Sequence, residues 1–102
     1  MAENNSQIII YQNENGETKL EVRFQDETVW LTQKLMAELF QTSVPNINIH
    51  LKNIFEEGEL AENRTIKDFL IVQQEGAREV KRKQVFYNLD AIISVGYRIK
   101  SH

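Results

Sequence analysis

The sequence predicts an α+β fold, a winged helix-turn-helix domain with an N-terminal β-hairpin before it and a C-terminal helix after it. Three features predict this class: two short helical patterns around a tight break, a strand–turn–strand pattern directly after them, and a last helical pattern. The length of 102 residues suits one domain with an ordinary core. We expect residues 1–27 to form the hairpin extension and residues 28–102 the winged helix-turn-helix domain.

The composition excludes several other classes of protein. Apolar residues make up 41% and charged residues 26%, which are globular proportions, and the chain has no cysteine for disulfides or thiolate metal sites. Apolar runs such as Phe69–Val72 are far shorter than the ~18 residues of a membrane span. The polar, acidic N-terminus is unlike a signal peptide, so we expect a cytoplasmic protein that does not enter the membrane.

The N-terminal segment has the pattern of a β-hairpin. Gln7–Tyr11 is β-branched and aromatic, and Asn15 with Gly16 forms a dipeptide typical of a two-residue turn. Apolar and polar residues alternate over 20–24, which predicts a half-buried strand with one solvated face. We expect Trp30 to be a core residue that fixes this hairpin to the first helix.

Two helices are predicted at about 32–40 and 43–56. Thr32 and Ser43 each precede an apolar pattern with helical spacing, and their hydroxyls can accept hydrogen bonds from free N–H groups of the first turn. Gly58 follows the second pattern and can end that helix in the left-handed conformation.

A wing hairpin is predicted at about 65–87. Two segments rich in Ile, Val, Phe and Tyr flank a short turn that contains glycine, and residues 59–64 before them are expected to be a polar connection. The C-terminal helix should begin at about residue 89, capped by Asn88 or Asp90.

Positive charge is concentrated in the last third of the chain. Residues 1–63 carry four Lys or Arg against eleven acidic residues, whereas residues 64–102 carry eight against four. Four of these eight fall close together in the second strand of the hairpin, where a wing can reach DNA phosphates. Because side chains alternate along a strand, we expect two or three of the four to bind. The candidate wing residues are Arg78, Lys81, Arg82 and Lys83.

The second helix would be the recognition helix, which lies in the major groove. Its outward positions carry asparagines, an isoleucine and a lysine; asparagine can pair with adenine, and an aliphatic group can contact a thymine methyl. The candidate DNA-binding residues of this helix are Ser43, Val44, Asn46, Asn48, Ile49, Lys52 and Asn53.

Three segments, Val29–Phe40, His50–Leu60 and Tyr87–Arg98, resemble the N-terminal region of the RhuM-type virulence-protein family. The similarity extends over most of the chain from about residue 28. It implies a bacterial, virulence-associated protein that binds double-stranded DNA, as a transcriptional regulator or as the targeting module of a longer protein. Members of that family are longer, so the resemblance also implies that His102 is not the natural C-terminus.

Departures from the family pattern leave an alternative function open. Gln41 and Thr42 stand where the family usually has a glycine and an aliphatic residue, and Val44 and Ile49 stand where it often has polar groups. This apolar helix surface is also compatible with a winged-helix module that binds another protein and does not read DNA sequence.

No pattern predicts an enzyme. The two histidines, His50 and His102, have no cysteine partners with which to form a zinc site, and no glycine-rich phosphate loop or nucleophile motif occurs. We therefore expect no catalytic residue, no metal, no cofactor and no small-molecule substrate. The expected partners are double-stranded DNA and a second copy of the chain in a possible homodimer.

Overall fold

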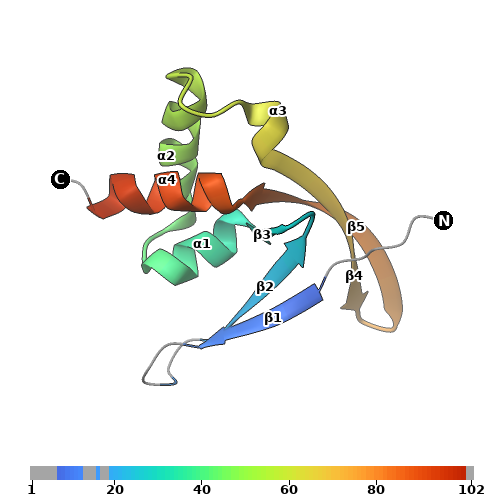
Figure 1. The fold of residues 1–102 in the computed structure, drawn as a ribbon. Helices are drawn as coiled ribbons and strands as arrows, with labels where there is room; N and C mark the ends of the chain where they lie inside the picture. The colour runs from blue at the N-terminus through green and yellow to red at the C-terminus, as the bar shows by residue number, and fades with distance from the viewer. Residues whose placement is uncertain (1–6, 13–15, 17–18, 101–102) are drawn as a thin grey trace.

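The protein is an α+β fold in which helices cover one face of an antiparallel sheet (Figure 1). The computed structural model describes residues 7–12, 16 and 19–100, and within them it contains five strands and four helices. In chain order these are β1 (Gln7–Gln12), β2 (Lys19–Gln25), β3 (Thr28–Leu31), α1 (Gln33–Phe40), α2 (Val44–Glu56), α3 (Glu62–Thr65), β4 (Ile66–Glu75), β5 (Arg78–Asn88) and α4 (Leu89–Lys100).

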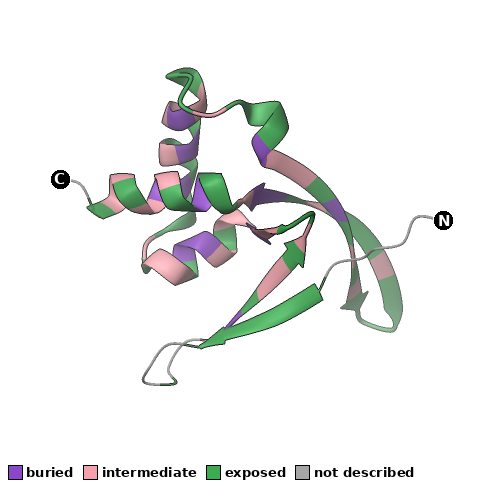
Figure 2. Cartoon of the chain, in the orientation of Figure 1, coloured by how far each residue is buried: buried purple, intermediate pink, exposed green. Residues whose placement is uncertain are grey.

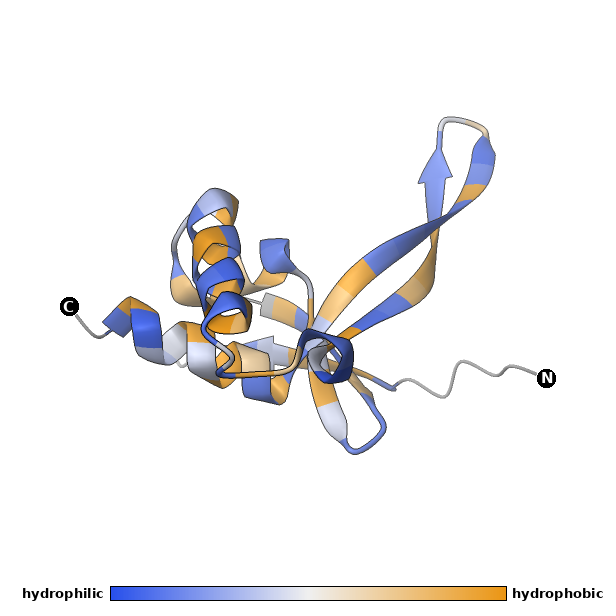
Figure 3. Ribbon diagram, turned by 90° about the horizontal axis from the view of Figure 1, so that it is seen from above, coloured by the Kyte–Doolittle hydropathy of each residue, from blue (hydrophilic) through white to orange (hydrophobic). Residues whose placement is uncertain are grey.

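The sheet joins the N-terminal hairpin to the later one. Its strand order is β1-β2-β3-β5-β4. The junction is the pairing of β3 with β5, where Leu31 lies opposite Tyr87. Beyond this junction β4 and β5 continue as a long hairpin that projects from the rest of the molecule (Figure 3).

The main core lies between the sheet and α1, α2 and α4. The apolar residues predicted from helical spacing contribute to it, and the buried positions lie along the inner sides of these helices (Figure 2). Its least exposed members on the helices are Met36, Ile47, Ile54, Ala91 and Val95. Leu31 and Tyr87 are the buried residues that the sheet contributes to this core. The helical spacing therefore predicted correctly which faces are buried.

A second, smaller core lies on the opposite face of the sheet, and it corrects the expected role of Trp30. Trp30 is buried, as predicted, but it packs on Phe69 and Phe86 of the long hairpin, away from α1. The Arg23 guanidinium lies 5.1 Å from the Phe69 ring centre, so the face of β2 that was predicted to be solvated is partly covered. The reason is that β2 and β3 are joined to β5 in one sheet, which brings the hairpin rings beside Trp30.

The predicted helix ends are confirmed. Thr32 Oγ1 accepts from the Leu35 N–H at 3.1 Å, Ser43 Oγ accepts from the Asn46 N–H at 3.2 Å, and Asn88 Oδ1 accepts from the Ala91 N–H at 3.2 Å. Each bond satisfies a donor that the first helical turn leaves free. Gly58, just after α2, has φ 77°, as a left-handed helix end requires.

One helix was missed. The segment expected to be only a polar connection contains α3, and Thr65, expected in a strand, is its last residue. The Thr65 hydroxyl donates to the Ala61 carbonyl at 2.7 Å, and the Arg64 N–H donates to the same carbonyl at 3.1 Å. A single turn held by local bonds has no apolar periodicity, so the sequence pattern does not reveal it.

Residue types predict the left-handed conformation of some turns but not of all. The predicted turn at Asn15 lies outside the described residues, although Gly16 has φ 71°. Asp26 and Glu27 join β2 to β3 with φ 56° and 62°, as a two-residue type I′ turn requires. In the long hairpin Gly76 has φ 63°.

The helix end at Gln41 stores conformational strain that can be removed. Gln41 has φ 55° and ψ 54°, a left-handed conformation that costs a residue with a Cβ roughly 1–2 kcal/mol. Gln41→Gly should therefore raise the free energy of unfolding by up to about 1 kcal/mol, because the flexibility of glycine in the unfolded chain offsets part of the gain. Urea unfolding followed by circular dichroism measures this. Gln41→Ala is the control and should give no such gain.

Candidate nucleic-acid interface

The outward face of α2 carries exposed aliphatic side chains as well as polar ones. Val44 and Ile49 are exposed by 40% and 55%, and Lys52 is also exposed. Asn53 is half-buried beside them, and its side chain has no hydrogen bond to any described residue. One cation, one free carboxamide and two aliphatic groups are thus available on this helix.

The side chains of two other predicted residues of α2 form hydrogen bonds within the protein. The Asn46 amide donates to Thr42 Oγ1 at 2.9 Å across the turn between α1 and α2. The Asn48 side chain accepts from Gln33 Nε2 at 3.3 Å, and the same Gln33 nitrogen donates to the Tyr87 hydroxyl at 3.0 Å. These two asparagines therefore stabilise the helix pair and its contact with the sheet.

The four predicted hairpin cations lie on two faces, as strand alternation predicted. Arg78 and Arg82 lie on the side of β5 that carries Phe86, and both flank Glu75 of β4. Arg82 Nε and Nη2 donate to the two Glu75 carboxylate oxygens at 2.9 and 3.0 Å. This ion pair partly neutralises the cations of that face.

Lys81 and Lys83 lie on the other face of the hairpin, on the side of β5 that carries Tyr87. Both are exposed, and neither forms an ion pair with any residue that the structure describes. Val72 lies opposite Lys81 and Leu70 lies opposite Lys83, so neither lysine has a charged residue directly opposite it on β4. Together with Arg78, which is also exposed and forms no ion pair with a described residue, these are the hairpin cations that are most available to a polyanion.

A groove links α2 to the base of the hairpin. It has a volume of about 300 Å³, and Asn48, Lys52, Glu56, Glu62 and Tyr87 line it. Tyr87 and Gln33 were not among the predicted site residues, because nothing in a single sequence shows that they meet between α1, α2 and β5. Glu56 and Glu62 make one side of this groove acidic, and a phosphate would avoid that side.

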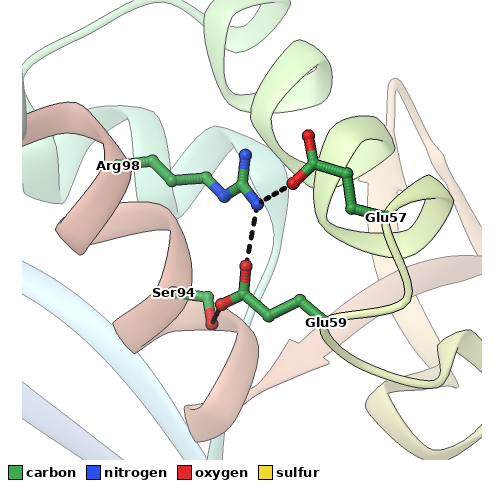
Figure 4. A network of polar contacts seen from close by, with 4 residues as sticks. All are labelled: Glu57, Glu59, Ser94 and Arg98. Atoms are coloured by element: carbon green, nitrogen blue, oxygen red, sulfur yellow. Dashed lines mark hydrogen bonds and ion pairs between the residues drawn. The ribbon is translucent and has the colours of Figure 1, made fainter.

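The C-terminal end of α2 is tied to α4 by a polar network (Figure 4). Arg98 Nη2 donates to Glu57 at 2.7 Å and to Glu59 at 2.8 Å, and the Ser94 hydroxyl donates to Glu59 at 2.7 Å. The hydrogen bond from Arg98, and secondly that from Ser94, hold the pKa of the Glu59 carboxyl below its ordinary value of 4.5. The network links the C-terminal end of α2 and the turn after it to α4 on the surface of the protein.

The network should give the protein a measurable pH dependence in acid. Because the folded-state pKa of Glu59 is lowered, the unfolded chain binds more protons below about pH 4.5, and the stability from this group is lost as the pH falls through the folded-state pKa. Glu59→Gln should lower stability at neutral pH only slightly, since Glu59 is exposed to solvent, and should flatten the acid decline. Thermal melts from neutral to acidic pH measure this. Equal flattening in the control Glu38→Gln, on the exposed face of α1, would contradict it.

Neither a metal site nor a membrane span is found in the described part of the chain. No group of three or more His, Cys, Asp or Glu residues there is arranged to hold a metal ion. No helix among those residues is both long and apolar enough to cross a bilayer.

The fold and this surface define an α+β protein with a tight helix pair followed by a long hairpin rich in cations. Residues 64–102, which include the long hairpin and α4, match the model of the virulence protein RhuM family. This match confirms the resemblance over the third similar segment, Tyr87–Arg98, and supports assignment of the chain to the RhuM-type family, whereas Val29–Phe40 and His50–Leu60 lie outside the matched residues. Neither the curated proteins nor the solved structures give a match to the chain.

Proposed function

We propose that this protein is a winged helix-turn-helix module that binds double-stranded DNA without catalysing a reaction, as part of a bacterial transcriptional regulator or of the targeting region of a longer protein. In this proposal α1 and α2 form the helix-turn-helix, α2 enters the major groove, and the β4–β5 hairpin is the wing. The order of these elements and their RhuM-type match support it.

The observation that carries the proposal is a pair of exposed lysines on one face of a projecting hairpin, neither of which forms an ion pair with a described residue. The β4–β5 hairpin carries five cations against three acidic residues in a chain whose net charge is −3. A local cluster of cations, rather than the total charge, determines whether a protein attracts DNA phosphates. Lys81 and Lys83 form no ion pair within the described part of the chain and are available for this role, whereas Arg82 is paired with Glu75.

Titration of a mixed-sequence duplex at several salt concentrations tests the proposal. The expected result is binding by fluorescence anisotropy at low salt, with an affinity that falls steeply as salt rises, because each contacted phosphate releases counterions. A single-stranded oligonucleotide of the same sequence is the control and should bind more weakly. Absence of duplex binding at low salt would refute the proposed function.

Asn53 is the residue of α2 best suited to test base readout. If it contacts a base, Asn53→Ala should cost about 1–3 kcal/mol on a duplex selected from a random pool and should barely change binding to random duplex. Asn46 is less informative, since its amide donates to Thr42 and Asn46→Ala would also remove this hydrogen bond across the turn between α1 and α2. Equal losses on both DNAs would reduce Asn53 to a backbone contact.

A second candidate function is favoured by the exposed aliphatic groups of α2. Val44 and Ile49 present an apolar patch on the outward face, and such side chains are typical of a helix that packs against another protein. In this alternative the wing lysines would only keep the hairpin edge soluble. Replacement of Ile49 by Lys separates the two functions, because it should strengthen non-specific duplex binding but disrupt a protein interface.

A further inference from the structure

The exposed face of α4 has an unusual composition for a surface helix. The exposed residues of α4 are Leu89, Asp90, Ile93, Tyr97 and Lys100. Ile93 and Tyr97 are exposed by 58% and 78%, although they occupy the middle of this face. A surface helix normally has a polar outer face, so an exposed apolar centre indicates an interaction surface.

A groove lies beside this face and extends the apolar surface. It has a volume of about 550 Å³, and Leu39 and Phe40 of α1 line it together with Ile92, Ile93 and Gly96 of α4. Gly96 lets the two helices approach closely, because a Cβ there would lie 2.9 Å from the Phe40 ring. A second apolar groove of about 280 Å³ shares Leu39 and Ile92 with the first. The apolar surface therefore extends beyond the exposed face of α4 onto α1.

We propose that the α4 face is a homodimer interface in which α4 packs antiparallel against α4 of a second copy. One register, centred at the level of Val95, places Tyr97 opposite Ile93 of the partner subunit. The same register places Lys100 opposite Asp90 of the partner subunit, and each contact occurs twice because a two-fold axis repeats it.

The positions of Asp90 and Lys100 favour a second copy of the chain as the partner that binds the α4 face. Asp90 precedes the centre by five residues and Lys100 follows it by five, so antiparallel pairing brings opposite charges together at both ends. Parallel pairing would place acid beside acid and base beside base. Antiparallel packing also places the two helix dipoles in opposite directions, which is favourable, and Tyr97 supplies an aromatic side chain for the groove of the partner subunit.

One helix pair with its flanking grooves buries little area for a specific interface, so the dimer should form only at higher concentration.

Sedimentation velocity without DNA tests this inference independently of the proposed function. The 12.0 kDa chain should shift toward twice its mass between low-micromolar and sub-millimolar concentration. Ile93→Asp and Tyr97→Asp should each weaken association at least about tenfold, as loss of a central contact does. The matched control is Val72→Asp, whose side chain is exposed by 56% on the hairpin; this variant should dimerise normally.

Charge reversal tests the register. Asp90→Lys alone and Lys100→Asp alone should each weaken the dimer, and the double variant Asp90→Lys/Lys100→Asp should restore it. Circular dichroism verifies that each variant is folded. A wild-type chain that stays monomeric over the whole range would overturn the inference. So would a dimer that Ile93→Asp leaves intact, or a double variant that remains as weak as the singles.

Discussion

Trp30→Ala is expected to lower the free energy of unfolding by about 3–5 kcal/mol, the range for removal of a large aromatic side chain from a packed core. Trp30 is only 6% exposed, and its ring lies 5.8 Å from that of Phe69 in an edge-to-face arrangement. Its indole N–H also donates to the Gln25 carbonyl at 2.9 Å. A loss of this size is a large part of the stability of a small domain.

Urea unfolding of Trp30→Ala, followed by circular dichroism, measures this loss. Trp30→Phe keeps an aromatic ring in the second core but lacks the N–H, so it should cost less, and its remaining deficit includes about 1 kcal/mol for the hydrogen bond. Val72→Ala is the surface control and should change stability by about 0.5 kcal/mol or less. If Trp30→Ala unfolded at the wild-type urea concentration, the second core would contribute little and the hairpin would be held by strand pairing alone.

Local signals in the sequence were sufficient to predict most of the elements. Thr32 and Ser43 act as N-caps as predicted, and of the two candidates for the last helix, Asn88 and Asp90, the cap is Asn88. Apolar alternation predicted β2, and β-branched and aromatic composition predicted β1, β4 and β5, apart from Thr65, which belongs to α3. These signals depend on neighbouring residues only, so they can be read without knowledge of the fold.

The packing of the sheet could not be predicted in the same way. Alternation states that Trp30 and Leu31 point to opposite faces, but it does not state which face the helices cover. That depends on the pairing of β3 with β5, between segments more than fifty residues apart in the chain. The prediction placed Trp30 against α1 because α1 follows it directly in sequence, whereas its partners come from the distant hairpin.

In the candidate site, too, local features could be predicted and contacts between side chains could not. The separation of the hairpin cations onto two faces followed from alternation, and the strand register confirms it. The ion pair of Arg82 with Glu75 and the hydrogen bond of Asn46 with Thr42 depend on register and rotamer, which one sequence does not reveal. These contacts reduce the number of free groups from those expected, and they make Lys81 and Lys83 the sharpest test of the proposed interface.

Replacement of Lys81 and Lys83 by alanine is expected to weaken duplex binding about 10- to 100-fold at about 0.1 M salt. Each contacted phosphate contributes about 0.9 to the slope of log affinity against log salt, so this variant should flatten the slope by nearly two units. The loss should be similar for every duplex sequence, because phosphate contacts position a protein without reading bases. Folding should survive, since both side chains are exposed and have no ion-pair partner among the described residues.

The matched control is Arg78→Ala with Arg82→Ala, which removes the same number of cations from the same strand. These arginines lie on the opposite face of the hairpin, and Arg82 is paired with Glu75, so this variant should flatten the slope less. Anisotropy titrations at several salt concentrations, with melting curves for each variant, give the comparison. An unchanged slope for a folded Lys81→Ala/Lys83→Ala variant would mean that the lysine face of the hairpin does not contact DNA. Equal flattening by both pairs would mean that the duplex reaches both faces of the hairpin, so that the ion pair with Glu75 does not keep Arg82 from the phosphates.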